Sequence, residues 1–125
     1  MSLFQLGNFT LHSGQQSDFK IDCDALTGKD WDALASLVKS RFEYRFVEGI
    51  PSGGTKLYGR LYDARQPRRR ELPILIVDDV LTTGQSMEQA AQKWAEQLPD
   101  EKIIGVVVFA RGPCPYWVTP IFQMW

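Results

Sequence analysis

The chain has 125 residues, of which 44% are hydrophobic and 12% aromatic, and its net charge at pH 7 is -1. This size is sufficient for one domain with a buried core, and the balanced charge argues against nucleic acids and anionic membranes as partners. No stretch approaches the roughly 20 apolar residues that cross a bilayer, and the first residues lack the pattern of a secretory signal. We therefore expect a soluble, cytoplasmic protein.

The N-terminal part of the sequence predicts loops followed by a helix. Residues 1–28 combine scattered apolar positions with glycine, serine and aspartate, which is typical of turns, and one short strand is expected over residues 19–23. Apolar residues recur at helical spacing from Trp31 onward, which predicts an amphipathic helix that ends near Arg41. Asp30 directly precedes this pattern and is the expected N-cap.

A strand, a glycine-containing loop and a second helix are predicted next. Residues 44–50 mix aromatic and β-branched side chains and stop at Pro51, which is typical of a strand that enters a loop. The second helix is expected after Gly54 and continues to about Ala64. A proline and three consecutive arginines at residues 67–70 then interrupt the helical pattern.

The most apolar part of the sequence predicts two buried strands with a helix between them. Residues 74–77 are apolar without interruption, which is typical of a parallel strand that is covered on both faces. The following helix is expected to use Thr83 or Ser86 as its N-cap and to continue until Pro99. Residues 103–109 resemble the first apolar run and predict the second buried strand.

The order of these elements predicts the fold class. Alternating strands and helices indicate a single α/β domain over residues 1–125, with a mainly parallel, twisted sheet, right-handed connections and helices on both faces. Ligands of such sheets bind at the carboxyl ends of the strands, where both glycine-containing loops of this sequence fall. The proline-rich tail, residues 112–125, is expected to add an edge strand and loops.

Residues 75–86, with the sequence LIVDDVLTTGQS, carry the clearest chemical signal. They predict a buried strand that delivers two carboxylates, followed by a loop of small residues that opens a helix. Backbone N–H groups at a helix N-terminus lack partners inside the helix and bind phosphate well. Hydroxyl side chains add donors, and a glycine lets the backbone approach the ligand closely. The predicted phosphate site comprises Thr82, Thr83, Gly84, Gln85 and Ser86.

Asp78 and Asp79 need a different ligand group, because carboxylates repel a phosphate. They are suited to accept hydrogen bonds from the two hydroxyl groups of a ribose that carries this phosphate. Because side chains alternate along a strand, only one of the two carboxylates is expected to point freely toward the ligand. The alternative for an isolated acidic pair or Thr-Gly pair is that it serves strand and helix capping alone.

The full run resembles the phosphoribosyl-pyrophosphate (PRPP) motif of the type I phosphoribosyltransferases, in which four apolar residues and two acids precede TTG and a hydroxyl residue. Two other regions resemble the orotate phosphoribosyltransferases within this family. Residues 9–14 (FTLHSG) and 17–22 (SDFKID) are similar to their N-terminal segment. Residues 49–54 (GIPSGG) are similar to their pyrophosphate-binding loop, which follows a strand and opens a helix.

The resemblance implies transfer of the phosphoribosyl group from PRPP to a nucleobase such as orotate, with release of pyrophosphate. It implies that Asp78 and Asp79 are the catalytic acids at the ribose. It also implies that Ser52, Gly53 and Gly54 hold the pyrophosphate, and the glycines before a helix are suited to present backbone N–H groups to such an anion. Mg²⁺ is expected to arrive as the PRPP complex, and no residue is expected to bind a metal directly.

The resemblance further implies a site for the base and a homodimer. The expected base-binding residues are His12, Phe19 and Lys20, although an ordinary structural role explains each of them equally well. The aromatic residues near the end of the sequence are suited either to the interface of a homodimer or to the core of the monomer. These residues are Trp117, Phe122 and Trp125.

The sequence departs from the family between its two glycine-containing loops. Orotate phosphoribosyltransferases place a further strand and a long mobile loop with basic residues there, whereas this chain has only residues 55–73. The arginines at residues 68–70 could supply positive charge near the pyrophosphate, or they could form a solvated basic turn. Two hypotheses therefore stand: a phosphoribosyltransferase, or a non-catalytic domain that binds PRPP or a nucleotide, either regulatory or vestigial.

Overall fold

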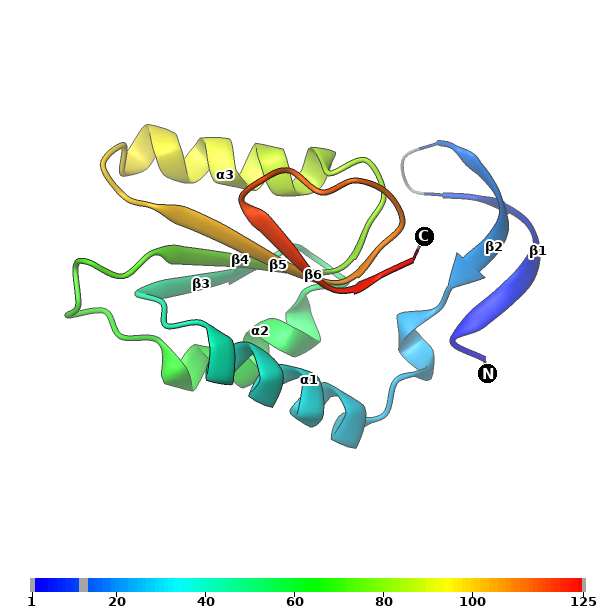
Figure 1. Ribbon diagram of the computed structural model, residues 1–125, viewed down its shortest axis with the longest axis horizontal. Helices are drawn as coiled ribbons and strands as arrows, with labels where there is room; N and C mark the ends of the chain where they lie inside the picture. The colour runs from blue at the N-terminus through cyan, green and yellow to red at the C-terminus, as the bar shows by residue number, and fades with distance from the viewer. Residues whose placement is uncertain (1, 12–13, 125) are drawn as a thin grey trace.

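Four parallel strands form the central sheet of the computed structural model, which describes residues 2–11 and 14–124 (Figure 1). Their order is β3 (Phe46–Gly49), β4 (Ile74–Leu81), β5 (Ile103–Ala110) and β6 (Val118–Gln123). The apolar run that begins β4 is fully buried, as expected for a strand that is covered on both faces. The predicted parallel sheet and the predicted edge strand in the tail are both confirmed.

Helices cover the two faces of this sheet, which confirms the predicted layers. The helices α1 (Gly28–Arg41) and α2 (Thr55–Leu61) lie on one face, and α3 (Gln85–Gln97) lies on the other (Figure 1). Side chains alternate along β4, so this strand contributes to the core on both faces of the sheet. Leu75 joins the core under α1 and α2, whereas Ile76 joins the core under α3. None of the helices within residues 2–11 and 14–124 has the length and apolarity to cross a membrane.

The two helical connections of the sheet have opposite hands, which corrects the expectation of uniformly right-handed connections. The strand order advances in one direction from β3 through β4 to β5, but α2 and α3 lie on opposite faces of the sheet. One of the two connections is therefore left-handed, an arrangement that is rare for parallel strands. Strands β3 and β4 are direct neighbours and pair in parallel from Phe46 with Ile74 to Gly49 with Val77.

A β-hairpin replaces most of the loop-rich entry segment that the sequence predicted. Strands β1 (Phe4–Thr10) and β2 (Gln16–Ile21) pair antiparallel and form a sheet of their own. A short 3₁₀ turn, Cys23–Ala25, follows and leads to α1. Strand β1 was not predicted from the sequence, and the second strand was predicted a few residues too late. Little of the hairpin is buried, so its strands show only a short alternation of apolar and polar residues.

Two helix starts also differ from the prediction. The N-cap of α1 is Thr27, whose hydroxyl oxygen accepts the N–H of Asp30 at 3.2 Å while the Asp30 carboxylate accepts the N–H of Thr27 at 2.8 Å. Asp30 thus belongs to a capping box and is not the cap. The N-cap of α3 is Gly84, not Thr83 or Ser86. The second helix ends as predicted, because α2 continues as a 3₁₀ turn over Tyr62–Ala64.

Candidate functional site

The loops that the sequence selected meet at one end of the sheet. The loop after β3 and the loop after β4 both lie at the carboxyl ends of neighbouring parallel strands, and the hairpin β1–β2 lies beyond the same end (Figure 1). Arg111, the first residue after β5, joins them through its N–H, which donates to the carbonyl of Leu81 at 2.9 Å. This convergence is the usual place for a ligand in an α/β sheet.

The two acids lie within β4 rather than after it. The sequence predicted a strand that ends at Val77, but β4 continues to Leu81 because its pairing with β5 continues past the acids. The N–H of Asp79 donates to Oδ1 of Asp78 at 2.8 Å, and the N–H of Val80 donates to Oδ1 of Asp79 at 2.7 Å. Both carboxylates are therefore turned back toward the backbone at the end of the strand.

Asp78 is the most strongly perturbed acid of this site. Burial raises the pKa of Asp78 to about 8, and the hydrogen bond and negative charge of Asp79 contribute to the same shift. Two carboxyl groups that share a half-buried place do not both ionise readily. Asp78 is therefore expected to be largely protonated at neutral pH.

The loop after β3 packs directly against Asp79. The N–H of Ile50 donates to the carbonyl of Val77 at 2.9 Å, which anchors the start of the loop on β4. A Cβ at Gly53 would overlap the carboxylate of Asp79, and a Cβ at Gly54 would lie 2.5 Å from the carbonyl oxygen of Val77. Only glycine fits at these two positions, so the loop and the acid form one structural unit.

The predicted phosphate loop opens α3. Gly84 has φ of +84°, a left-handed conformation that favours glycine, and its left-handed turn directs the chain into the helix. The N–H of Gln85 donates to the hydroxyl oxygen of Thr83 at 3.3 Å. Thr83, Gln85 and Ser86 are exposed and Thr82 is half-buried, so this loop is open to a ligand from solvent. The residues selected from the sequence thus lie together at the start of a thirteen-residue helix.

Arg111 is a site residue that the sequence reading missed. Its guanidinium lies over the ring of Phe19 with 3.8 Å between Cζ and the ring centroid. Its Nη2 donates to the hydroxyl of Ser17 at 2.5 Å, and its Nη1 donates to the carbonyl of Phe19 at 3.2 Å. Burial lowers the pKa of Arg111, and the charge of Asp18 opposes that shift. A charged residue directly after a buried strand was the available signal.

The three expected base-binding residues have different outcomes. Phe19 is half-buried on the face of β2 that meets Arg111. Lys20 follows it in the strand, so its side chain leaves from the opposite face, and it is exposed. His12 lies outside the described residues. The structure therefore brings Phe19 to the site and does not bring Lys20 there.

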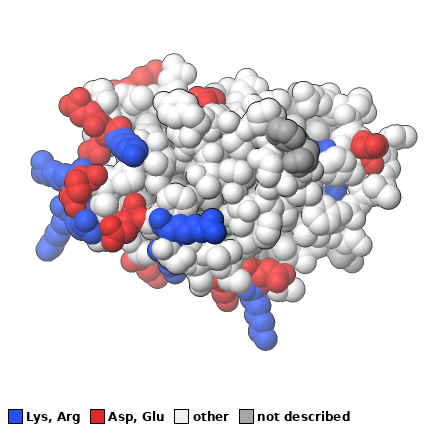
Figure 2. All heavy atoms as spheres, in the orientation of Figure 1, with Lys and Arg blue, Asp and Glu red and all other residues white. Residues whose placement is uncertain are grey.

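The arginines of residues 68–70 lie at the other end of the sheet. They precede the start of β4, and basic and acidic side chains mix at that end of the molecule (Figure 2). Nε of Arg69 donates to Glu71 at 2.7 Å, and its Nη1 lies 3.4 Å from Glu43. This placement matches the solvated basic turn, not a source of charge at the glycine loops.

Solved structures of phosphoribosyltransferases share the fold of this chain. No protein-family model matches the sequence, and no curated protein matches it either. The similarity is found among solved structures. Their sequence identity to this chain is so low that the similarity shows the fold alone.

Three of these solved structures illustrate how far the similarity extends. Leishmania donovani UMP synthase has a TM-score of 0.69 and 18% identity, over 98% of this chain and 33% of that chain. Orotate phosphoribosyltransferase from Aeropyrum pernix has a TM-score of 0.66 and 21% identity, over 88% of this chain and 76% of that one. Helicobacter pylori xanthine-guanine-hypoxanthine phosphoribosyltransferase has a TM-score of 0.52 and 19% identity, over 74% and 85%. This chain therefore spans a third of the first protein and about three quarters or more of the other two.

Proposed function

We propose that the protein is a phosphoribosyltransferase that binds PRPP and transfers its phosphoribosyl group to a nucleobase such as orotate, with release of pyrophosphate. The observation that supports this most is the contact between Gly53 and the carboxylate of Asp79. It places a loop suited to one anion beside a strand end suited to ribose, and the helix start suited to a second anion follows on the same strand. PRPP has these three groups in this order.

Each part of the ligand has a matching part of the site in this proposal. The 5′-phosphate accepts hydrogen bonds from the backbone N–H groups and hydroxyls at the start of α3. The ribose hydroxyls donate to Asp78 and Asp79. The pyrophosphate lies on the loop of Ser52, Gly53 and Gly54, whose backbone provides the donors.

The carboxylates also fit the Mg²⁺ that PRPP brings. Mg²⁺ prefers oxygen ligands, keeps much of its water and binds proteins through one or two carboxylates together with phosphate groups. Within the described residues, no cluster of three or more Asp, Glu, His or Cys side chains could hold a metal ion alone. The ion would arrive bound to PRPP and neutralise pyrophosphate charge without a direct ligand from the protein, and the Asp79 carboxylate would lie near it beside the glycine loop.

Orotate is proposed as the base because a cation borders the expected base side of the site. Arg111 lies between the end of β5 and the hairpin, and Phe19 offers an aromatic ring next to it. A flat base that carries a carboxylate suits this combination of a guanidinium and a ring.

A second candidate is a PRPP or nucleotide-binding domain without catalysis. It is favoured by the position of the short connection after α2, whose arginines lie at the amino end of the sheet. No basic residue of this connection reaches the pyrophosphate loop. Because the loss of one donor that stabilises the transition state lowers a rate by about 10²–10³, this absence favours binding without catalysis.

Pyrophosphate release in the presence of PRPP, Mg²⁺ and single bases distinguishes the two candidates. The proposal predicts release with one base and its loss in the double variant Asp78→Asn, Asp79→Asn, with the circular dichroism spectrum unchanged. The control Asp63→Asn removes an exposed carboxylate from the 3₁₀ turn after α2 and should keep full turnover. PRPP binding without release for orotate, uracil or any purine base favours the second candidate.

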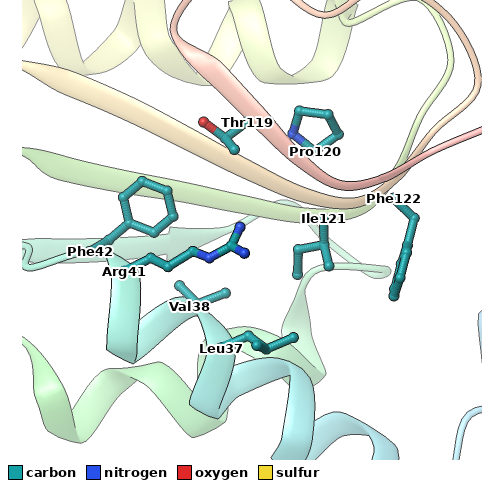
Figure 3. Close-up of a pocket in the computed structure, with 8 residues that line it drawn as sticks. All are labelled: Leu37, Val38, Arg41, Phe42, Thr119, Pro120, Ile121 and Phe122. Carbon is teal, nitrogen blue, oxygen red and sulfur yellow. The ribbon is translucent and has the colours of Figure 1, made fainter.

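A homodimer is also part of the proposal, and one surface is suited to it. A shallow apolar pocket of about 170 Å³ lies between α1 and the edge strand β6, lined by Leu37, Phe42, Ile121 and Phe122 among others (Figure 3). Leu37 is 44% exposed and Phe122 is 47% exposed. Trp117, in contrast, is half-buried and donates to Glu88 at 3.1 Å, and Trp125 lies outside the described residues. Sedimentation of a single 14.3 kDa species would contradict the homodimer.

A further inference from the structure

The hairpin β1–β2 has no backbone connection to the central sheet other than the chain itself. In the described part of the chain, its backbone hydrogen bonds all remain within residues 3–22. Most of its side chains are exposed or half-buried, and Leu6 is 90% exposed. The position of the hairpin over the site therefore depends on a few side-chain contacts.

Arg111 provides the polar part of these contacts. Among the described residues, the side-chain hydrogen bonds that join the hairpin strands to the central sheet or its loops all come from its guanidinium, which donates to the hydroxyl of Ser17 and the carbonyl of Phe19. The same group stacks on the Phe19 ring. An edge-to-face contact between Phe4 and Phe109, with 6.0 Å between ring centroids, adds an apolar contact.

At the central sheet, the backbone of Arg111 is held rigidly. Arg111 follows the buried strand β5, and its own N–H is held by the carbonyl of Leu81 at the end of β4. One residue thus links the two strands, with its backbone N–H on β4, which carries the two acids, and its side chain on β2, which carries Phe19. The planar guanidinium can stack and donate in two directions at once, which an ammonium cannot do.

We propose that Arg111 is a positioning residue that holds the hairpin, and with it Phe19, over the carboxyl end of the sheet, and so sets the affinity for the nucleobase. This role rests on the proposed function for its effect on the base, but the attachment itself is a property of the ligand-free protein. The hairpin supplies the base side of the site, and PRPP is held by the sheet alone. Loss of the attachment should therefore weaken base binding and leave PRPP binding unchanged.

Hydrogen exchange of the ligand-free protein, followed by mass spectrometry, tests the attachment without any assumption about function. In Arg111→Gln, amides of residues 4–21 should exchange at least about ten-fold faster, as expected for the loss of a charge-assisted hydrogen bond, with β4 and β5 unchanged. Ser17→Ala removes one of the two acceptors on the hairpin and should shift the same peptides in the same direction by less. The control Arg60→Gln removes a cation paired with Asp32 at 2.7 Å and should leave the hairpin unchanged.

Kinetics of the same variants separate this inference from the proposed function. KM for the base should rise in Ser17→Ala, which keeps the guanidinium, as well as about ten-fold in Arg111→Gln, with KM for PRPP unchanged in both. Arg111→Lys should restore little of the loss, because an ammonium cannot stack and donate together. Unchanged hairpin exchange in both Arg111→Gln and Ser17→Ala overturns the attachment. Faster exchange in a protein that shows no turnover with any base supports the attachment and refutes the transferase.

Discussion

The central sheet and the N-terminal hairpin are held by different forces. Ile74 and Leu75, at the start of β4, are completely buried between layers of helices, whereas Leu6 on β1 is 90% exposed. The sheet is stabilised by apolar burial, whereas the hairpin is attached through Arg111, the edge-to-face contact of Phe4 with Phe109, and Ile21, the last residue of β2, which is buried in the core. In the proposed function, the sheet is the rigid part that binds the phosphoribosyl group and the hairpin is the weakly attached part that borders the base.

Truncation of one leucine in each part gives the largest expected difference. Leu75→Ala should lower the free energy of unfolding by about 2–5 kcal/mol, because it leaves a cavity in the packed sheet. Leu6→Ala on the hairpin should change it by less than about 0.5 kcal/mol. Urea denaturation of both variants measures the contrast. Equal losses would mean that the hairpin belongs to the same cooperative core.

Two glycine substitutions compare the loop after β3 with the helix α2 that follows it. Gly54→Ala should cost about 1–3 kcal/mol, because its Cβ would lie 2.5 Å from the backbone carbonyl of Val77. Gly59→Ala is the matched control, since nothing lies within 4 Å of its Cβ, and within α2 it should stabilise by about 1 kcal/mol. Thermal and urea unfolding should shift in opposite directions for the two variants. A Gly54→Ala protein as stable as the wild type would disprove the close packing of this loop.

The raised pKa of Asp78 should make the stability of the folded protein depend on pH. The pKa of Asp78 is raised from 3.8 to about 8 in the folded protein, chiefly by burial, so the folded state holds a proton that the unfolded state releases. This contribution to stability is complete below the unfolded pKa and is lost as the pH rises through about 8. Asp78→Asn stays neutral, so its stability relative to the wild type should increase between about pH 5 and about pH 8. A constant difference over that range would contradict the raised pKa.

The smallest effect is expected at the amino end of the sheet. Arg69→Ala removes an exposed ion pair with Glu71, which is expected to contribute less than about 1 kcal/mol. Turnover and PRPP affinity should both stay at the wild-type value, because this arginine lies at the end of the sheet opposite the site. A loss of PRPP affinity in Arg69→Ala would show that the basic turn does reach the ligand.

The comparison also explains which features the sequence predicted. The strands around residues 74–77 and 103–109 and the two glycine loops follow from local patterns, namely continuous apolar runs and glycines before a helix. Strand β1 was missed because a half-exposed hairpin leaves little apolar alternation. The extension of β4 past Asp79 depends on pairing with β5, a long-range contact that no local pattern records.

The site residues also divide into those that local patterns predicted and those that depend on long-range contacts. Asp79 and Gly53 were both selected from the sequence, but their contact joins strand β4 to the loop after β3, two segments that are separated along the chain. Arg111 was missed because its partners, Ser17 and Phe19, lie more than ninety residues earlier in the chain. The opposite hands of the two connections depend on which face each helix covers, and amphipathic patterns do not specify that face.

Calorimetric titration with PRPP and Mg²⁺ tests the central claim most directly, because it concerns the rigid part of the site alone. We predict saturable binding to the wild-type protein and to Asp63→Asn. In Asp78→Asn, Asp79→Asn the affinity should fall at least about 100-fold, as expected when the hydrogen bonds of both carboxyl groups to the ribose hydroxyls are lost. Absence of binding to the wild type, or equal binding to the double variant, would contradict a phosphoribosyl site on β4.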